Sequence, residues 1–258
     1  MQKEKVDGII LILSCQKHMN GRLMEFKLPK KYYNNHKVIY AIGDLFLENN
    51  YELRDDEMLW IKTEDSYLHL LKKLVLAIKY LYELYDITEG ILRCGDDLEF
   101  DENKLMEFLN NKKYDFYGQS YKGEDYINED ENELKICRQD SFMHDYYKYH
   151  TEDFSNPLHN LSSLNCEIIA SYAMRPNIWG PSGVIYYLSN KSCNILIDHM
   201  EKINYNILHY DEFSKSYPYT IEDVGVTFIM YLNKIKFTNY SNFFDTSNSI
   251  CRHTNKYK

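Results

Sequence analysis

A short buried strand that ends in two adjacent carboxylates is the feature that most constrains the fold of this chain. Residues 90–94 (GILRC) are predicted to form the strand, and Asp96 and Asp97 follow it. In α/β proteins, ligands bind at the carboxyl ends of the central strands. Acidic oxygen ligands at such a place suit a hard divalent cation, which in turn can hold a phosphate. The alternative is a solvated acidic turn, because segment 98–103 continues acidic into a helix that looks N-capped.

Predicted strands and helices alternate along the chain. The expected strands cover residues 6–14, 37–42, 59–62, 90–94 and 115–118. A long helix is expected after a cap at Asp65 and Ser66, and a short one at 103–109. Two more are expected, one from the turn at 180–183 through Tyr187, Leu188, Ile195 and Leu196, and one capped by Thr220 with a buried face from Val224 to Ile235. The alternation predicts an α/β fold with a mostly parallel, Rossmann-like central sheet flanked by helices.

The organisation of the chain favours one domain over residues 1–258, which is long enough to bury a substantial core. No repeat and no long linker divides it. From residue 119 to 163 the pattern weakens, with hairpin-like fragments around 134–137.

The charge and hydropathy of the chain exclude several partners. A net charge of −9 without a basic cluster argues against nucleic acid or an anionic membrane surface. The longest apolar run, residues 8–13, is far shorter than the ~20 residues of a membrane span. Acidic Asp7 flanks that run where a signal peptide would be basic, so we expect a soluble, cytoplasmic protein without a membrane anchor.

Six scattered cysteines lack the short spacing of a zinc site. Free thiols in a reducing compartment are expected, and a disulfide between distant cysteines stays open. The frequent use of Tyr, Asn and Lys is typical of an AT-rich genome, such as that of a protist or a giant virus.

Three further segments carry residue types that suit ligand binding. Residues 65–73 (DSYLHLLKK) start a helix and present Lys73, which is either a ligand-facing or a solvated side chain. Residues 179–189 (WGPSGVIYYLS) contain Gly183, where the backbone can approach a ligand closely, and Trp179, which either stacks on a sugar or packs in the core. Residues 221–226 (IEDVGV) place two acids in a first helical turn, where the helix dipole alone would favour them.

Together with Gly95-Asp96-Asp97, these segments resemble the β-1,3-galactosyltransferase and Fringe-like glycosyltransferases, inverting enzymes of the GT-A fold. The order and spacing match from about residue 8 to residue 235. The chain departs from the family in four ways. His69 replaces an Asn of the Asp-Ser-Tyr-x-Asn-Leu-x-x-Lys signature, and Gly95 replaces the first acid of the acidic triplet. Only Gly183 remains of three glycines, and the glycine of the Glu-Asp-Val segment comes early.

The resemblance implies roles for individual residues. Asp97 would coordinate Mn²⁺ or Mg²⁺, with His253 as a second ligand if it is more than an exposed tail residue. Asp96 would face the ribose or the sugar. One acid of Glu222 and Asp223 would be the general base, and Asp223 matches better. The remaining nucleotide-sugar contacts would come from Ser14, Lys17, Arg22, Lys73, Gly183 and Trp179, with Asp44 a weaker candidate.

The implied activity is a metal-dependent, inverting transfer of a hexose (galactose, GlcNAc or similar) from a UDP-sugar to a glycan or glycoprotein hydroxyl, through a β-1,3 linkage. The nucleotide-binding half would span about 6–118 and the acceptor and catalytic half about 119–258. A catalytically inactive GT-A-like module that binds glycans or nucleotides is the main alternative, motivated by the lost acid and glycines. A calcium-binding loop at 96–101 is disfavoured, because it lacks the glycine of an EF-hand turn.

Overall fold

The computed structural model describes residues 3–120, 150–162, 178–207 and 219–254, and the backbone of two short paired strands, β9 (Ile136–Arg138) and β10 (Met174–Pro176). The described residues form one nine-stranded sheet with the order β12-β8-β11-β6-β1-β3-β5-β4, and β2 pairs with β3. Its strands are β1 (Glu4–Leu13), β2 (Tyr32–Tyr33), β3 (His36–Gly43), β4 (Tyr51–Arg54), β5 (Met58–Ile61), β6 (Tyr85–Cys94), β8 (Phe116–Gly118), β11 (Ile185–Ser189) and β12 (Phe237–Asn239). A separate ladder joins β7 (Leu98–Phe100) to β13 (Cys251–His253).

The centre of the sheet is parallel. Strands β6, β1, β3 and β5 run in the same direction, whereas β11 lies antiparallel between β6 and β8. The carboxyl ends of β1, β3 and β6 therefore meet at one edge. The predicted α/β class with a mostly parallel central sheet is confirmed.

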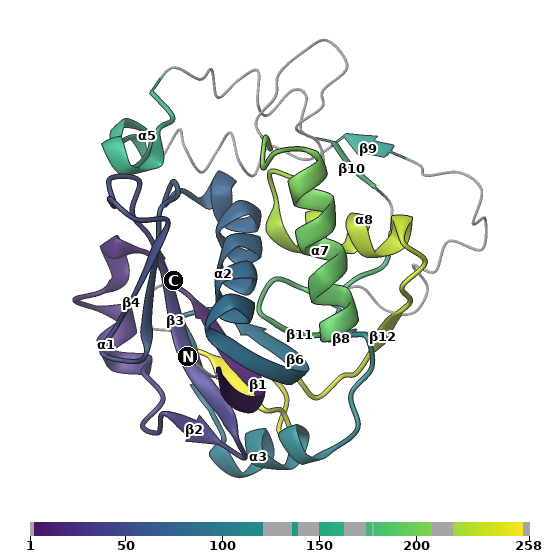
Figure 1. Cartoon of the computed structure of the whole chain (residues 1–258). Coiled ribbons are helices and arrows are strands. Elements are labelled where there is room, and N and C mark those ends of the chain that lie inside the picture. The colour runs from purple at the N-terminus through teal and green to yellow at the C-terminus, as the bar shows by residue number, and fades with distance from the viewer. Residues whose placement is uncertain are drawn as a thin grey trace.

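Helices cover both faces of this sheet. The helical segments are η1 (Gln16–His18), α1 (Arg22–Phe26), η2 (Tyr67–His69), α2 (Leu70–Leu84), α3 (Glu102–Asn110), α5 (Thr151–Ser155), η4 (Pro157–His159), α7 (Asn190–Lys202) and α8 (Glu222–Leu232). Figure 1 shows α2 and α7 side by side over one face, and they contact each other and β6.

The apolar residues of β1 supply two separate cores. Ile9 and Leu11 pack with α2 and α7 on one face, and Ile10 and Ile12 pack with α3 on the other. All four side chains are almost fully buried. Alternate residues of a strand point to opposite faces, so an unbroken apolar run is what a central strand with two covered faces requires.

The long helix begins close to the predicted place. The Ser66 hydroxyl accepts a hydrogen bond from the His69 amide and caps the short turn η2, from which α2 continues. Buried residues at helical spacing, including Leu71, Leu74 and Leu81, fix α2 on the sheet. Burying each such side chain contributes roughly 1.5–3 kcal/mol.

Two predicted helix starts are wrong. Tyr187 and Leu188 belong to strand β11, where they pair with β6 on one side and β8 on the other. The helix α7 begins only at Asn190, after the Ser189 hydroxyl accepts a hydrogen bond from the Ser192 amide. At α8 the cap position is Ile221, without a side-chain bond, so Thr220 is not the cap.

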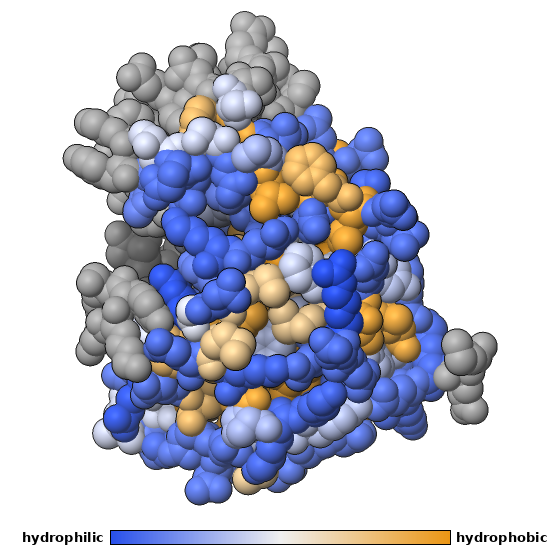
Figure 2. Space-filling model, turned by 90° about the vertical axis from the view of Figure 1, so that its left-hand side faces the viewer, coloured by the Kyte–Doolittle hydropathy of each residue, from blue (hydrophilic) through white to orange (hydrophobic). Residues whose placement is uncertain are grey.

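The region from 119 to 163, predicted to be irregular, lies mostly outside the described residues. Residues 134 and 135 of the expected hairpin-like fragment are among those outside. Strand β9, which follows them, pairs with the distant β10. Where the chain is described, no helix combines the length and apolar character needed to cross a membrane. Figure 2 shows that polar residues cover most of the face on the side of α1 and β4, with apolar residues in small groups.

Candidate functional site

The carboxyl edge of the central strands collects most of the predicted site residues. Asp96 follows β6 and lies against the end of β1, where the Ser14 hydroxyl donates a hydrogen bond to Asp96 Oδ2 at 2.7 Å. His18 Nδ1 is also 2.7 Å from Oδ2, and Arg22 Nη1 is 3.6 Å from Oδ1. Both carboxylate oxygens of Asp96 therefore have protein partners. Asp96 is 9% exposed, so it does not belong to a solvated acidic turn.

The pKa values of His18 and Asp96 are shifted so that both side chains are charged at neutral pH. The hydrogen bond to Asp96 raises the pKa of His18 to about 9, so the imidazole is protonated at neutral pH. Burial alone would raise the pKa of Asp96, but the hydrogen bonds from His18 and Ser14 outweigh burial and hold this pKa below its usual value. The cluster is an ion pair with a second cation, Arg22, beside it.

Lys73 is buried, so its alternative role as a solvated helix residue is wrong. Its ammonium donates to the carbonyl of Ser14 at 2.6 Å and to Asp65 Oδ1 at 2.8 Å, and it is 2% exposed. Asp65 in turn accepts from the amides of Gln16 and Gly43. Lys73 thus connects α2 to the ends of β1 and β3 from inside the protein.

Lys17 lies in a different environment from the other predicted nucleotide contacts. Its ammonium is 3.1 Å from both oxygens of Asp153 and 3.7 Å from Glu152. His150, Glu152 and Asp153 form a group that could bind a metal, the only such group of three among the residues the structure describes. Asp153, however, already has the ammonium of Lys17 as a counter-ion.

Asp223 is held at the first turn of α8, where its Oδ2 accepts a hydrogen bond from the Gly183 amide at 2.8 Å. Its Oδ1 accepts from the Val224 amide. A Cβ at position 183 would lie 3.3 Å from Asp223 Oδ2, a close contact that a shift of a few tenths of an ångström would relieve. Burial raises the pKa of Asp223 above its usual value, and Arg93 opposes that effect.

Glu222 faces the other way. Its Oε2 accepts from Arg93 Nη2 at 2.8 Å, its Oε1 accepts from the Tyr186 hydroxyl, and it is 4% exposed. Burial raises the pKa of Glu222 to about 7, although Arg93 opposes the rise. Both oxygens of Glu222 are engaged by side chains inside the protein, whereas Asp223 is partly exposed and accepts from two backbone amides.

His253 lies on β13, and Asp97 lies in the bend directly before the neighbouring strand β7. His253 is the register partner of Leu98, and the amide of Thr254 donates to the carbonyl of Asp97 at 3.0 Å. A side chain at Gly95 would come within 3.1 Å of Asp97 Oδ1, so an acid at position 95 would crowd Asp97. The glycine at position 95, where the family has the first acid of the triplet, therefore leaves room for the side chain of Asp97.

A carboxylate fixes the ring of His253. Asp245 Oδ2 lies 2.5 Å from His253 Nδ1, which leaves Nε2 as the nitrogen for a ligand. Metal-binding histidines usually bond a carboxylate in this way through their other nitrogen. Oxygen and imidazole nitrogen are ligand types for Mn²⁺, but Asp97 and His253 belong to no group of three possible ligands among the described residues.

Trp179 packs against another aromatic ring, and Asp44 bonds within its own turn. The Trp179 ring packs edge-on against Phe237, with 5.0 Å between centroids. Asp44 Oδ1 accepts from the amide of Phe46 within a turn after β3. These contacts favour packing for Trp179 and a turn-forming role for Asp44.

Sequence reasoning missed four residues of this region. His18, Arg93 and Asp245 bond predicted site residues directly. Tyr67 lies near enough to Asp223 and Asp97 for their charges to raise its pKa, after burial, which is the larger cause. Arg93 carried a visible signal, since a charged residue stands inside an apolar strand. Tyr67 stands inside the 65–73 segment (DSYLHLLKK), whereas His18 and Asp245 have no local sequence mark.

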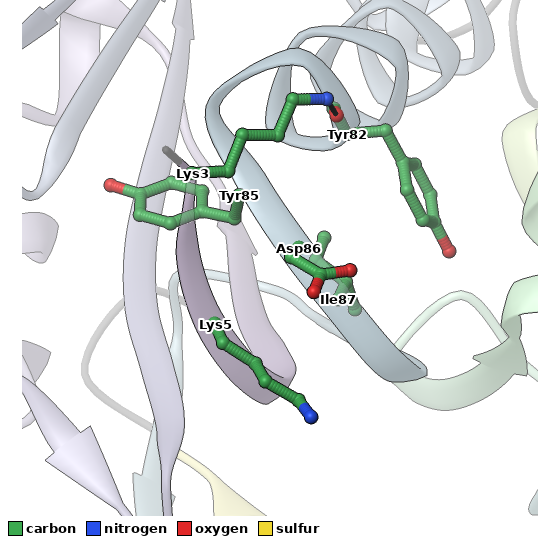
Figure 3. A pocket seen from close by; sticks show the side chains of 6 residues that line it. All are labelled: Lys3, Lys5, Tyr82, Tyr85, Asp86 and Ile87. Carbon is green, nitrogen blue, oxygen red and sulfur yellow. Dashed lines mark hydrogen bonds between the residues drawn. The ribbon is translucent and has the colours of Figure 1, made fainter. Parts of the chain in front are cut away.

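A pocket of about 450 Å³ lies at the opposite end of β1, away from these acids. Figure 3 shows its lining, with Lys3 reaching the carbonyl of Tyr82 at 2.6 Å and Lys5 pointing away from it. None of the residues predicted for the site lines this pocket.

No protein-family model matches the chain, and no curated protein matches it. Among solved structures, it is similar to apo mouse xyloside xylosyltransferase 1, with a TM-score of 0.37 and 9% sequence identity over 98% of each chain. A likeness of this size leaves the activity to be argued from the residues of the chain itself.

Proposed function

We propose that the chain is a metal-dependent, inverting glycosyltransferase with a GT-A-type domain. It would transfer a hexose, such as galactose or GlcNAc, from a UDP-sugar to a glycan hydroxyl and form a β-1,3 linkage. The observation that carries this proposal is the connection between two acids of distant segments. The amide of Gly183 bonds Asp223, and the carbonyl of the next residue, Val184, bonds the amide of Gly95, two residues before Asp97.

Asp223 is the proposed general base. An acceptor hydroxyl would give its proton to this carboxylate as its oxygen attacks the anomeric carbon, and the bond to the UDP oxygen would break on the opposite face. The raised pKa of Asp223 suits a base better than an ordinary surface Asp. Glu222 is not proposed as the base, because it is buried and ion-paired with Arg93, whereas Asp223 is partly exposed and accepts from two backbone amides.

Asp97 and His253 would hold Mn²⁺ or Mg²⁺. A divalent ion there supplies charge neutralisation for the departing diphosphate. Ser14, Arg22 and Asp96 would form the nucleotide side, with His18 and Lys73 fixing their positions. This assignment keeps the chain as one domain, with a nucleotide-binding half at about 6–118 and an acceptor half at about 119–258.

A cytoplasmic location is part of the proposal. The thiols of Cys94, Cys193 and Cys251 are free and buried, which suits a reducing compartment.

The decisive experiment measures UDP release from UDP-galactose, UDP-GlcNAc and UDP-glucose, each with Mn²⁺, with Mg²⁺ and with a chelator. We expect metal-dependent release from one of the donors, and faster release when a glycan acceptor is added. Absence of UDP release from every donor would reject the proposed enzyme activity.

A catalytically inactive nucleotide- or glycan-binding module is the second candidate. The complete pairing of Asp96 with protein groups favours it, because this acid then has little capacity left for a ribose or sugar hydroxyl. A thermal-shift panel with the same donors identifies the module, since a ligand that binds only the native state raises the melting temperature without turnover.

A further inference from the structure

Arg93 is a fully charged side chain in the middle of the sheet. It lies on the central strand β6, opposite Tyr186 of β11, and is 3% exposed. Its Nη1 donates to the carbonyl of Gly183 and, at 3.3 Å, to that of Val184. Its Nη2 donates to Glu222 at 2.8 Å. One guanidinium thereby joins β6, the turn before β11 and the start of α8.

Glu222 completes this arrangement from the helix side. It accepts from the hydroxyl of Tyr186, whose ring also lies 5.5 Å from the Arg93 guanidinium carbon. Glu222 and Arg93 are thus each fixed by two or more partners. The carboxylate of Glu222 fixes the first turn of α8, and with it the backbone of Asp223.

The two ends of this contact chain are the two proposed functional acids. On one side is Gly183. Its carbonyl accepts from Arg93, and its amide donates to Asp223 Oδ2. On the other side, Val184 bonds both Arg93 and the amide of Gly95, which precedes the Asp96-Asp97 turn. These bonds connect the guanidinium to Asp223 and to the turn that carries Asp97.

We propose that Arg93 and Glu222 are a buried positioning pair that sets the carboxylate of Asp223 relative to Asp97. The inference rests on the proposed function for its catalytic consequence, but the positioning itself is a property of the protein without ligand. Neither residue is placed in contact with substrate.

A stabilising role alone does not account for the pair. Burying two charges costs desolvation energy that their attraction often fails to offset, and apolar residues of similar volume are frequently as stable. In addition, Arg93 Nε has no hydrogen-bond partner among the described residues. The guanidinium is oriented by the hydrogen bonds that its two terminal nitrogens donate to the Gly183 turn and to Glu222.

The test compares Arg93→Met, Glu222→Gln and the double variant with both residues changed to Met. Lys37→Met is the matched control, because Lys37 is also a buried cation on a central strand, paired with Asp56 and remote from the acids. Glu222→Gln keeps the volume and one acceptor oxygen for Arg93, while its NH₂ group can donate to the Tyr186 hydroxyl, so it remains informative if Arg93→Met folds poorly.

The first measurement is activity-independent: ¹³C NMR titration of the Asp223 carboxyl, assigned by its absence in Asp223→Asn. The groups that face Asp223 are Arg93, Glu222, Tyr186 and Tyr67. Loss of the Arg93 charge raises the pKa of Asp223. The pKa of Glu222 is about 7, so Glu222 is uncharged where Asp223 titrates, and Glu222→Gln shifts the pKa of Asp223 only by moving its carboxylate. A pKa of Asp223 that changes in neither variant beyond its change in Lys37→Met would overturn the positioning pair.

The second measurement separates kcat from KM. A base displaced by about 1 Å loses about 10²-fold in rate. We therefore expect the double variant to lose kcat with KM for the donor little changed, and Lys37→Met to keep both. Equal kcat for the double variant and the wild type would also overturn the inference. If the wild-type protein releases no UDP, the proposed function fails, whereas the NMR titration still decides the positioning pair.

Discussion

His18 Nδ1 lies 2.7 Å from Asp96 Oδ2 and connects the loop after β1 to the turn after β6, 78 residues later in the chain. Of the two side chains, Asp96 is 9% exposed and His18 27%. The pair fixes the nucleotide side of the proposed site before any ligand binds. Its strength depends on the protonation of the imidazole.

The first prediction concerns the stability that this ion pair contributes. The pKa of His18 is raised from 6.5 to about 9 on folding, so the contribution is complete below about pH 6.5 and is lost as the pH rises through about 9. Its size is about 3 kcal/mol. Urea unfolding of the wild type should show this loss between neutral and alkaline pH, and His18→Gln should not. His199→Gln, which removes an imidazole whose pKa burial lowers, should keep the alkaline loss.

The second prediction concerns the buried Lys73–Asp65 pair. Lys73→Met leaves the buried carboxylate of Asp65 without its counter-ion, which should cost about 3–5 kcal/mol in unfolding free energy. Its neighbour Lys72 pairs with Glu64 at 22% exposure, and Lys72→Met should cost about 1 kcal/mol or less. Urea denaturation curves measure both. Equal losses would mean that the Lys73 pair contributes no more than a surface pair.

The third prediction uses two glycines with opposite surroundings. A Cβ at Gly180 would lie 2.1 Å from Thr227 Oγ1 on α8, whereas a Cβ at Gly21 has no neighbour within 4 Å. Gly180→Ala should therefore destabilise the protein by about 1–3 kcal/mol through displacement of α8. Gly21→Ala meets no such clash and should cost less, about 1 kcal/mol or below, because alanine is a weaker N-cap for α1 than glycine. Thermal unfolding of the two variants gives the comparison, and a stable Gly180→Ala would contradict the tight packing of this turn.

The central strands could be predicted because their sequences are unbroken apolar runs. Ile9 to Leu13 has no polar residue, and a parallel strand buried on both faces demands such a run. The stretch Ile185 to Leu188 is equally apolar, but it is too short for periodicity to separate helix from strand. The segment forms a strand because it pairs with β6 on one side and with β8 on the other, and a local sequence pattern does not contain that information.

The places of the candidate acids in the fold could also be predicted, and their partners could not. Asp96 and Asp97 stand directly after a strand, and Asp223 stands at a helix start, so their positions in the fold follow from local sequence. Arg93 and Glu222 are separated by 129 residues. Only the antiparallel placement of β11 next to β6 brings them together, and that placement was the part of the secondary structure that the sequence predicted wrongly.

The fourth prediction concerns metal-dependent nucleotide binding. Asp97→Ala should weaken UDP affinity when Mn²⁺ is present and leave it unchanged in a chelator, because the lost carboxylate acts through the ion. Isothermal titration under both conditions measures the difference. Glu99→Ala removes an exposed acid two residues later and should change neither value. Equal affinity of Asp97→Ala with and without metal, at the wild-type value, would remove Asp97 from the metal site.

The last prediction concerns the base. Asp223→Asn keeps the volume of the side chain and an oxygen that can accept from the Gly183 amide, but the amide cannot take a proton from the acceptor. Transfer should fall by about 10²–10⁴-fold while UDP affinity stays near the wild-type value. In the wild type, kcat should fall as the pH drops through a pKa raised above that of an ordinary Asp, and this acidic limb should vanish in the variant. Asp198→Asn, on the exposed face of α7, is the control for the change of charge. Transfer that survives in Asp223→Asn with its acidic limb intact would assign the proton to another group, and would leave the Gly183 contact as a purely structural bond.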